Sequence, residues 1–377
     1  MDANSIGIVE TKFFTFAQPP NEMHLESGVK LGPITLAYET YGQLNERGDN
    51  ALLITHALSG DAHVAGYYSP NDPKPGWWDF MVGPGRPFDT NKYFVVCSNV
   101  LGGCKGSTGP TSTNPATGKP YNLNFPVVTI GDMVKAQREL VRHLNISKLH
   151  AVVGGSMGGM QALEWAIKYP DMVAAALPIA TTSRLNAQGI AFDEVGRQAI
   201  YADANWKNGD YSDYNLIPAQ GLSVARMLAH ITYLSEESMH EKFGRRLQEK
   251  ERYGYDFSTD FEVESYLRYQ GESFIKRFDA NTYLYISKAI DYFDLSRDYG
   301  SLENAFKNVQ AKFLVLSFTS DWLFTTAQAK EIVRALMVNG KHVTFCEIPS
   351  NYGHDSFLLR NACMEKMIAD FLSYANA

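Results

Sequence analysis

The sequence has little cysteine, no long apolar run and no excess of basic residues. Its four cysteines, Cys97, Cys104, Cys346 and Cys363, form no C-x-x-C pair, which argues against a disulfide-rich secreted scaffold. No stretch approaches the ~20 apolar residues that span a bilayer, and the first residues do not resemble a signal peptide. A formal net charge of −7 disfavours nucleic acid and anionic membranes as partners. We therefore expect a cytoplasmic protein with no nucleic-acid or membrane partner.

Hydrophobic residues make up 45% of the 377 residues and charged residues 20%, which is typical of a folded protein with a large core. Short β-branched or apolar runs alternate with helical segments, and this alternation predicts an α/β fold with a mostly parallel sheet flanked by helices. The runs are PITLAYETY, ALLITHALSG, KYFVVCSNV, LHAVVGGS and MVAAALPIA before residue 182, and AKFLVLSF and HVTFCEIP after residue 310.

Residues 183–305 lack strand-like runs and carry helical spacing with many charges, as in GLSVARMLAHITYLS. Because sheet-type runs resume at 311, we predict an inserted helical lid at 183–305 within a core formed by 1–182 and 306–377. Thr129 and Asp132 precede MVKAQRELVRHL with the spacing of a capping box, which predicts that a crossover helix begins there.

A single serine stands among glycines in VVGGSMGGMQ. Gly154, Ser156 and Gly158 form the G-x-S-x-G pattern between a predicted strand and a predicted helix, which is the context of a nucleophile elbow. Glycine at these positions allows a sharp turn that exposes the hydroxyl. A helix N-cap serine in a glycine-rich turn is the simpler alternative.

A serine nucleophile needs a base, and the base needs an acid that orients it. In elbow enzymes the chain order is serine, acid, histidine, with the partners on loops after strands. Asp321 follows AKFLVLSFTS and His354 follows HVTFCEIPSNYG, so we predict the triad Ser156, Asp321 and His354. His230, inside the helical insertion, and His342, at the start of a strand, are rival bases.

Acyl transfer also needs hydrogen-bond donors for the negative charge that develops on the carbonyl oxygen. The backbone N–H of Met157, directly after the serine, is one predicted donor. The loop after the strand at residue 51, with the sequence HALSG, supplies the other, and we predict the Leu58 N–H.

These segments together resemble a known family. HALSGDAH, VVGGSMGGMQALEWA, GLSVARMLAHITYLS, SFTSDWLF and NYGHDSF are similar to the corresponding segments of homoserine O-acetyltransferases, and the resemblance extends over essentially the whole chain. It implies an α/β-hydrolase fold with a helical lid, a cytoplasmic homodimer and a role in methionine biosynthesis.

The resemblance further implies ping-pong transfer from acetyl-CoA to L-homoserine through an acetyl ester on Ser156. His354 would act as the base and Asp321 would orient it. Acetyl-CoA would be a co-substrate, with no permanently bound cofactor, and no clustered His/Cys pattern suggests a metal.

By the same resemblance, Arg226 would bind the α-carboxylate of homoserine and Asp355 its α-ammonium. Both types suit the task, because each end of a zwitterion that leaves water needs a counter-charge. On the predicted helix around Arg226, the side chains of Arg226, His230 and Tyr233 form a polar stripe separate from an apolar face of Val224, Met227, Leu228, Ile231 and Leu234.

Relatives that transfer succinyl groups carry an arginine at the position two residues after the catalytic acid. This chain has Leu323 there, which favours an acetyl donor because an apolar side chain cannot pair with a carboxylate. Homoserine O-succinyltransferase, serine O-acetyltransferase, a serine esterase or thioesterase, and a noncatalytic binding protein on the same fold are the alternatives.

Overall fold

The computed structural model describes residues 5–374 and is built on one eight-stranded sheet. The strand order is β1-β4-β8-β5-β9-β10-β11-β12. The strands from β8 to β12 in this order are parallel, whereas β4 pairs antiparallel with both β8 and β1. The bounds are β1 Lys12–Phe16, β4 Ile34–Tyr41, β5 Ala51–Thr55, β8 Phe94–Ser98, β9 Leu149–Gly155, β10 Ala175–Ile179, β11 Lys312–Phe318 and β12 Val343–Ile348.

Every strand-like run of the sequence analysis is a strand of this sheet, so the predicted α/β fold is confirmed. The edge strand β1 was not predicted, because its sequence KFFTF is short and mostly accessible to solvent. Two short ribbons complete the strands: β2 (Met23–His24) pairs with β3 (Lys30–Leu31), and β6 (Val82–Gly83) pairs with β7 (Phe88–Asp89).

The sheet is buried on both faces, as parallel sheets are. Alternate residues of β5 show this, since Leu53 joins one apolar cluster and Leu52 and Ile54 join the other. The first cluster contains side chains of α1 (Ile130–His143), α2 (Met157–Lys168) and α10 (Thr326–Val338), and the second contains side chains of α11 (Ala362–Tyr374).

Helix α1 begins at the predicted capping box, which is confirmed. The Thr129 hydroxyl accepts a hydrogen bond from the Asp132 N–H at 3.1 Å, and the Asp132 carboxylate accepts one from the Thr129 N–H at 3.2 Å. The other Asp132 oxygen accepts the Glu26 N–H at 2.9 Å. The cap therefore also fixes the chain near the β2–β3 ribbon against α1.

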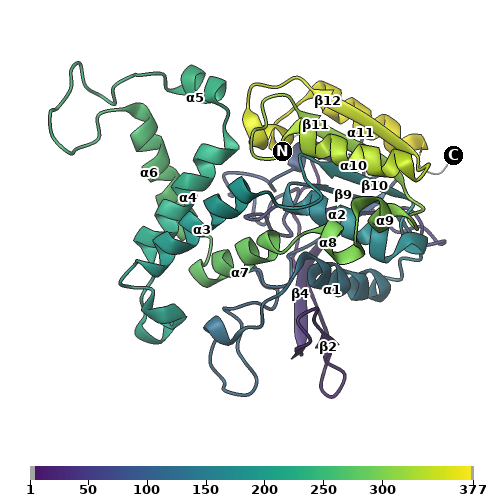
Figure 1. The fold of residues 1–377 in the computed structure, drawn as a ribbon. Coiled ribbons are helices and arrows are strands. Elements are labelled where there is room, and N and C mark those ends of the chain that lie inside the picture. Colours follow the sequence, from purple (N-terminus) through teal and green to yellow (C-terminus); the bar gives the residue numbers. More distant parts are fainter. Residues whose placement is uncertain (1–4, 375–377) are drawn as a thin grey trace.

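Between β10 and β11 the chain is helical. The helices are α3 Ala187–Tyr201, α4 Ala219–Tyr233, α5 Glu236–Lys242, α6 Glu262–Ile275, α7 Ala280–Asp291, α8 Leu295–Tyr299 and α9 Leu302–Phe306. Figure 1 shows α3, α4, α5 and α6 grouped beside the sheet, with α7 between them and the sheet. The 183–305 boundary of the lid stays a prediction.

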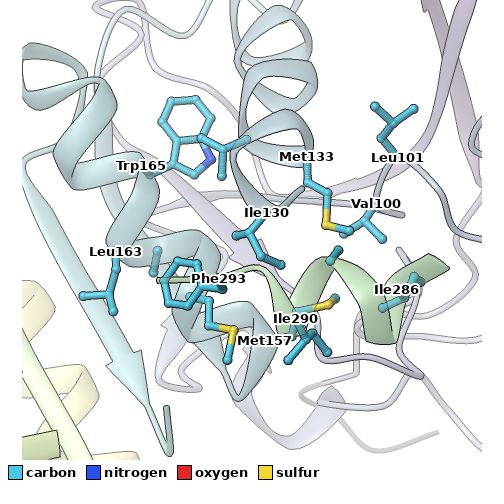
Figure 2. Packing of buried hydrophobic residues seen from close by; sticks show 14 of the residues in the cluster. Val100, Leu101, Ile130, Met133, Met157, Leu163, Trp165, Ile286, Ile290 and Phe293 are labelled. Atoms are coloured by element: carbon cyan, nitrogen blue, oxygen red, sulfur yellow. The ribbon is translucent and has the colours of Figure 1, made fainter. Parts of the chain in front are cut away.

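Helix α7 is buried along most of its length and joins the same apolar cluster as α1 and α2. Figure 2 shows the side chain of Met157, the first residue of α2, beside Ile290 and Phe293, which lie at the end of α7 and just after it. The residue that follows Ser156 is therefore held by packing from α7.

Replacing Thr129 with alanine should lower the free energy of unfolding by ~1 kcal/mol, the usual loss when an N-cap side chain is removed. Thr129→Ser keeps the hydroxyl and should stay near the wild type. Urea denaturation followed by circular dichroism measures both. Equal stability of the two variants would show that the cap contributes nothing.

Candidate active site

Ser156 lies at a sharp turn between β9 and α2. Its backbone angles, φ 59° and ψ −125°, are a strained combination for a residue with a side chain. Neighbouring segments hold the turn from both sides. The Ser156 N–H donates to the Ile179 carbonyl at 2.9 Å, and the Ser156 carbonyl accepts the Thr181 hydroxyl at 2.8 Å. The predicted strand, turn and helix of a nucleophile elbow are therefore present.

The two glycines of the motif are required because the end of β5 passes very close to the turn. A Cβ atom at Gly158 would lie 2.0 Å from the Thr55 carbonyl oxygen, and one at Gly154 would lie 2.3 Å from the Thr55 hydroxyl. That hydroxyl donates to the Gly158 carbonyl at 2.8 Å. Side chains are absent around Ser156 because backbone and side-chain atoms of neighbouring segments fill the space that a Cβ would need.

Asp321 and His354, from the ends of β11 and β12, form a buried pair. His354 Nδ1 lies 2.8 Å from Asp321 Oδ2. Because a carboxylate only accepts hydrogen bonds, Nδ1 carries the proton and Nε2 keeps its lone pair. The other Asp321 oxygen accepts the N–H groups of Leu323 at 3.0 Å and Phe324 at 2.9 Å. The carboxylate is thereby fixed in orientation.

Burial alone would lower the pKa of His354, but the Asp321 carboxylate and then Asp355 outweigh it, so the pKa is raised above the usual 6.5. The rival His230 is buried, and burial together with Arg226, Arg277 and Lys242 lowers its pKa to about 3. It faces the Tyr266 hydroxyl at 3.0 Å. His342 is exposed just before β12, at the opposite end of the strand from His354.

Ser156 and the His354–Asp321 pair lie near the same group of side chains. A cavity of about 60 Å³ is lined by Ser156, Leu58, Tyr233, Leu323 and Phe324, among others. The His354 ring contacts two of these side chains, with centroid distances of 5.1 Å to Phe324 and 5.9 Å to Tyr233. Ser156, Leu58 and Leu323 therefore line one cavity, and the His354 ring packs against two other side chains of its lining.

Both segments that carry the predicted oxyanion donors are joined by one side chain that the sequence analysis missed. The buried Gln161 amide nitrogen lies 3.1 Å from the His56 carbonyl oxygen and 3.3 Å from that of Met157. The Leu58 turn is closed by the Gly60 N–H, which donates to the Ala57 carbonyl at 3.0 Å. Met157 is the first residue of α2, where backbone N–H groups have no helical partner.

Arg226 is buried on α4 without a carboxylate partner among residues 5–374. Its guanidinium lies 4.6 Å from the centre of the Phe274 ring and 5.5 Å from that of Tyr233, and one nitrogen is 3.4 Å from the Ser59 hydroxyl. The Nε atom is buried and makes no hydrogen bond. A buried cation in this state has donors available for a ligand.

Asp355 follows His354 directly, and no hydrogen bond or ion pair within residues 5–374 involves its carboxylate. Burial raises its pKa, and the opposing effects of His354, Arg226 and Lys242 do not cancel this rise. A bound ammonium group would stabilise the ionised carboxylate.

The polar stripe on α4 faces inward: Arg226 and His230 are buried, and Tyr233 lines the cavity beside Ser156. The predicted apolar face is only partly buried, because Val224 is 48% and Ile231 41% exposed whereas Leu234 is buried. The helix therefore buries polar side chains toward the site and leaves two apolar ones on the outside. Tyr233 follows Arg226 by seven residues, which is about two helical turns, so both side chains lie on the same face of the helix. This spacing is the sequence signal that could place Tyr233 at the site.

The geometry is that of a known fold class. A family model described as alpha/beta hydrolase fold matches residues 50–360. The homoserine O-acetyltransferase of Solidesulfovibrio magneticus is 58% identical over 374 residues, covering 98% of this chain and 94% of its own.

Two solved structures are similar throughout. The crystal structure of homoserine O-acetyltransferase from Bacillus anthracis has a TM-score of 0.90 at 32% identity, covering 97% of this chain and 98% of its own. That of esterase E22 has a TM-score of 0.88, also at 32% identity, covering 97% and 100%. The chain belongs to the α/β-hydrolase family and, within it, to the homoserine O-acetyltransferases.

Among residues 5–374, no helix has the length and apolar character needed to span a membrane. No group of three or more His, Cys, Asp or Glu side chains in that part of the chain could hold a metal ion.

Acylation of Ser156 by p-nitrophenyl acetate should slow as the pH falls, with an inflection above 6.5. The raised pKa means that His354 gains a proton, and loses its capacity to act as a base, at a higher pH than a free imidazole. Asp321→Asn should lower the inflection and reduce the rate by roughly 10⁴-fold. Stopped-flow rates across the pH range test this, and a flat profile or an inflection below 6.5 would contradict it.

Proposed function

We propose that this chain transfers the acetyl group of acetyl-CoA to the hydroxyl of L-homoserine through an acetyl ester on Ser156. The observation that carries the proposal is the buried, unpaired Arg226 beside the Ser59 hydroxyl, in a chain closely related to proteins named homoserine O-acetyltransferase. Hydrolysis of a simple ester needs no such cation. An amino-acid acceptor with an α-carboxylate does.

In the first half-reaction the Ser156 oxygen attacks the thioester carbonyl while His354 Nε2 takes the hydroxyl proton. The N–H groups of Met157 and Leu58 stabilise the oxyanion. The carbon–sulfur bond then breaks, the CoA sulfur receives the proton from His354, and acetyl-Ser156 remains. Asp321 holds the ring and stabilises its positive charge between these transfers.

In the second half-reaction His354 takes the proton of the homoserine hydroxyl, whose oxygen attacks the acetyl-Ser156 carbonyl. The bond to the Ser156 oxygen breaks and that oxygen recovers the proton, which releases O-acetyl-L-homoserine. Arg226 binds the α-carboxylate and Asp355 the α-ammonium. Because Asp355 adjoins His354 in sequence, binding of the ammonium places the amino acid next to the base.

The acyl donor is acetyl-CoA as a co-substrate. Leu323 lines the cavity beside Ser156 and contributes only apolar surface, which suits an acetyl methyl group. The chain is expected to act in the cytoplasm, in methionine biosynthesis.

We expect a homodimer assembled through the outer surface of α3 and α4. Apolar side chains there are 39–54% exposed, which is unusual for a helix pair that faces only water. They are Ile190, Val195, Val224 and Ile231.

An esterase is the second candidate, because esterase E22 shares this fold with a TM-score of 0.88. Both reactions pass through the same acyl-serine, and only the acceptor differs.

Release of free CoA from acetyl-CoA, measured with a thiol reagent, should be slow after an initial burst and should accelerate strongly when L-homoserine is added. L-serine, shorter by one methylene, should be roughly 10- to 200-fold less effective. Product analysis by mass spectrometry should find O-acetyl-L-homoserine. Steady release that ignores every amino acid would establish the esterase instead.

Arg226→Ala should raise the KM for homoserine by roughly a hundredfold, the size expected when one partner of a buried charge pair is removed. The CoA burst from acetyl-CoA alone should persist, since that half-reaction does not use Arg226. Arg334→Ala, on the exposed surface of α10, is the matched control and should change neither quantity. An unchanged KM in Arg226→Ala would remove the residue from the substrate site.

A further inference from the structure

The cavity beside Ser156 contains a carboxyl group that the proposed chemistry does not use. Asp193, on α3, lines the same space as Ser156, Leu58 and Leu323. The rest of the lining is mostly apolar or aromatic, and no lysine or arginine side chain among the described residues lines it. An acyl group esterified to Ser156 therefore faces a carboxyl group and no cation.

Asp193 is half-buried and lies close to a cluster of charges that joins α3 to α7. Asp291 is near enough to raise the pKa of Asp193, and Asp291 lies 2.8 Å from Arg197 and 3.7 Å from Lys288. Arg197 also contacts Glu194 at 3.0 Å. The nearest cations are thus already paired with acids other than Asp193, which leaves none available for a further carboxylate.

Burial and the negative charge of Asp291 raise the pKa of Asp193 to about 8. At neutral pH the Asp193 carboxyl is therefore largely protonated, and its site already disfavours a second negative charge. An additional carboxylate from a ligand would meet the same desolvation and the same repulsion from Asp291.

We propose that Asp193 is a specificity-determining residue that keeps acyl donors with a terminal carboxylate out of the cavity beside Ser156. The inference rests on the proposed function and extends it, because it assigns donor selectivity to α3 as well as to Leu323. An acetyl group ends in a methyl group, which the apolar lining accommodates. A succinyl group would carry its terminal carboxylate toward Asp193 and Asp291 without a counter-ion.

The first test uses the wild-type enzyme and separates size from charge. Butyryl-CoA and succinyl-CoA both carry four-carbon acyl groups, but only succinyl is charged. The burst of CoA release, which reports acylation of Ser156 without an acceptor, should be faster with butyryl-CoA by roughly a hundredfold. Equal burst rates for the two donors would overturn the proposal, whatever the variants do.

The second test changes the residue. Asp193→Asn replaces the carboxyl by an isosteric amide that stays neutral at every pH. Measured at pH 9, where most of Asp193 is ionised, the substitution should raise the ratio of succinyl-CoA to acetyl-CoA acylation rates by roughly tenfold. Glu241→Gln removes an exposed acid from α5, outside this cluster, and should leave the ratio unchanged. A ratio in Asp193→Asn equal to that of Glu241→Gln would contradict the proposal.

These readouts are independent of the acceptor. If the burst occurs but homoserine does not accelerate turnover, the proposed transferase function fails while donor selectivity is still measured. If homoserine accelerates turnover and the donors acylate equally, the function stands and the role of Asp193 is rejected.

Discussion

Thr55, at the end of β5, contacts the backbone of Gly158, near the start of α2. This contact determines where Ser156 can lie. The Thr55 hydroxyl binds the Gly158 carbonyl, while the Thr55 carbonyl occupies the space that a Cβ at position 158 would fill. A strained serine is tolerated because its surroundings fix it on every side. The loop that carries the predicted oxyanion donor Leu58 starts one residue beyond Thr55, so the same contact fixes the position of Ser156 relative to that loop.

The charged side chains near Ser156 differ in how many hydrogen-bond and ion-pair partners they have within the protein. This difference distinguishes a residue that is held in place by the fold from residues that are free to bind a ligand. Asp321 has its histidine and two backbone N–H groups, so it is complete before any substrate arrives. Arg226 is buried and Asp355 is half-buried, and neither has such a partner among residues 5–374. Leaving charged groups in this state lowers stability, which is the usual relation between a preorganised site and its fold. In the proposed function, the α-carboxylate and α-ammonium groups of homoserine pair with both groups at once.

Much of this could be predicted from the sequence, because the signals are local. Strand runs, the capping box and G-x-S-x-G each depend on neighbours in the chain, and the order of Ser156, Asp321 and His354 follows from the order of the strands. Gln161 and Asp193 could not be found in this way. Gln161 matters because it reaches two carbonyls from different segments, and Asp193 because α3 is folded against α7. Such roles arise from tertiary contacts, which produce no periodic pattern in the sequence.

Helix α4 presents Arg226 to the site and Val224 and Ile231 to the outside, so its two sides are separated by about one helix diameter, ~10 Å. A surface that covers the outer side and a ligand that fills the inner side both act on the same rigid element. Any displacement of α4 that one of them favours changes the binding free energy of the other, and by thermodynamic reciprocity the effect is equal in both directions. If the proposed dimer forms through the outer side of α4 and Arg226 binds the amino acid, then assembly and amino-acid affinity are coupled quantities, to be measured together.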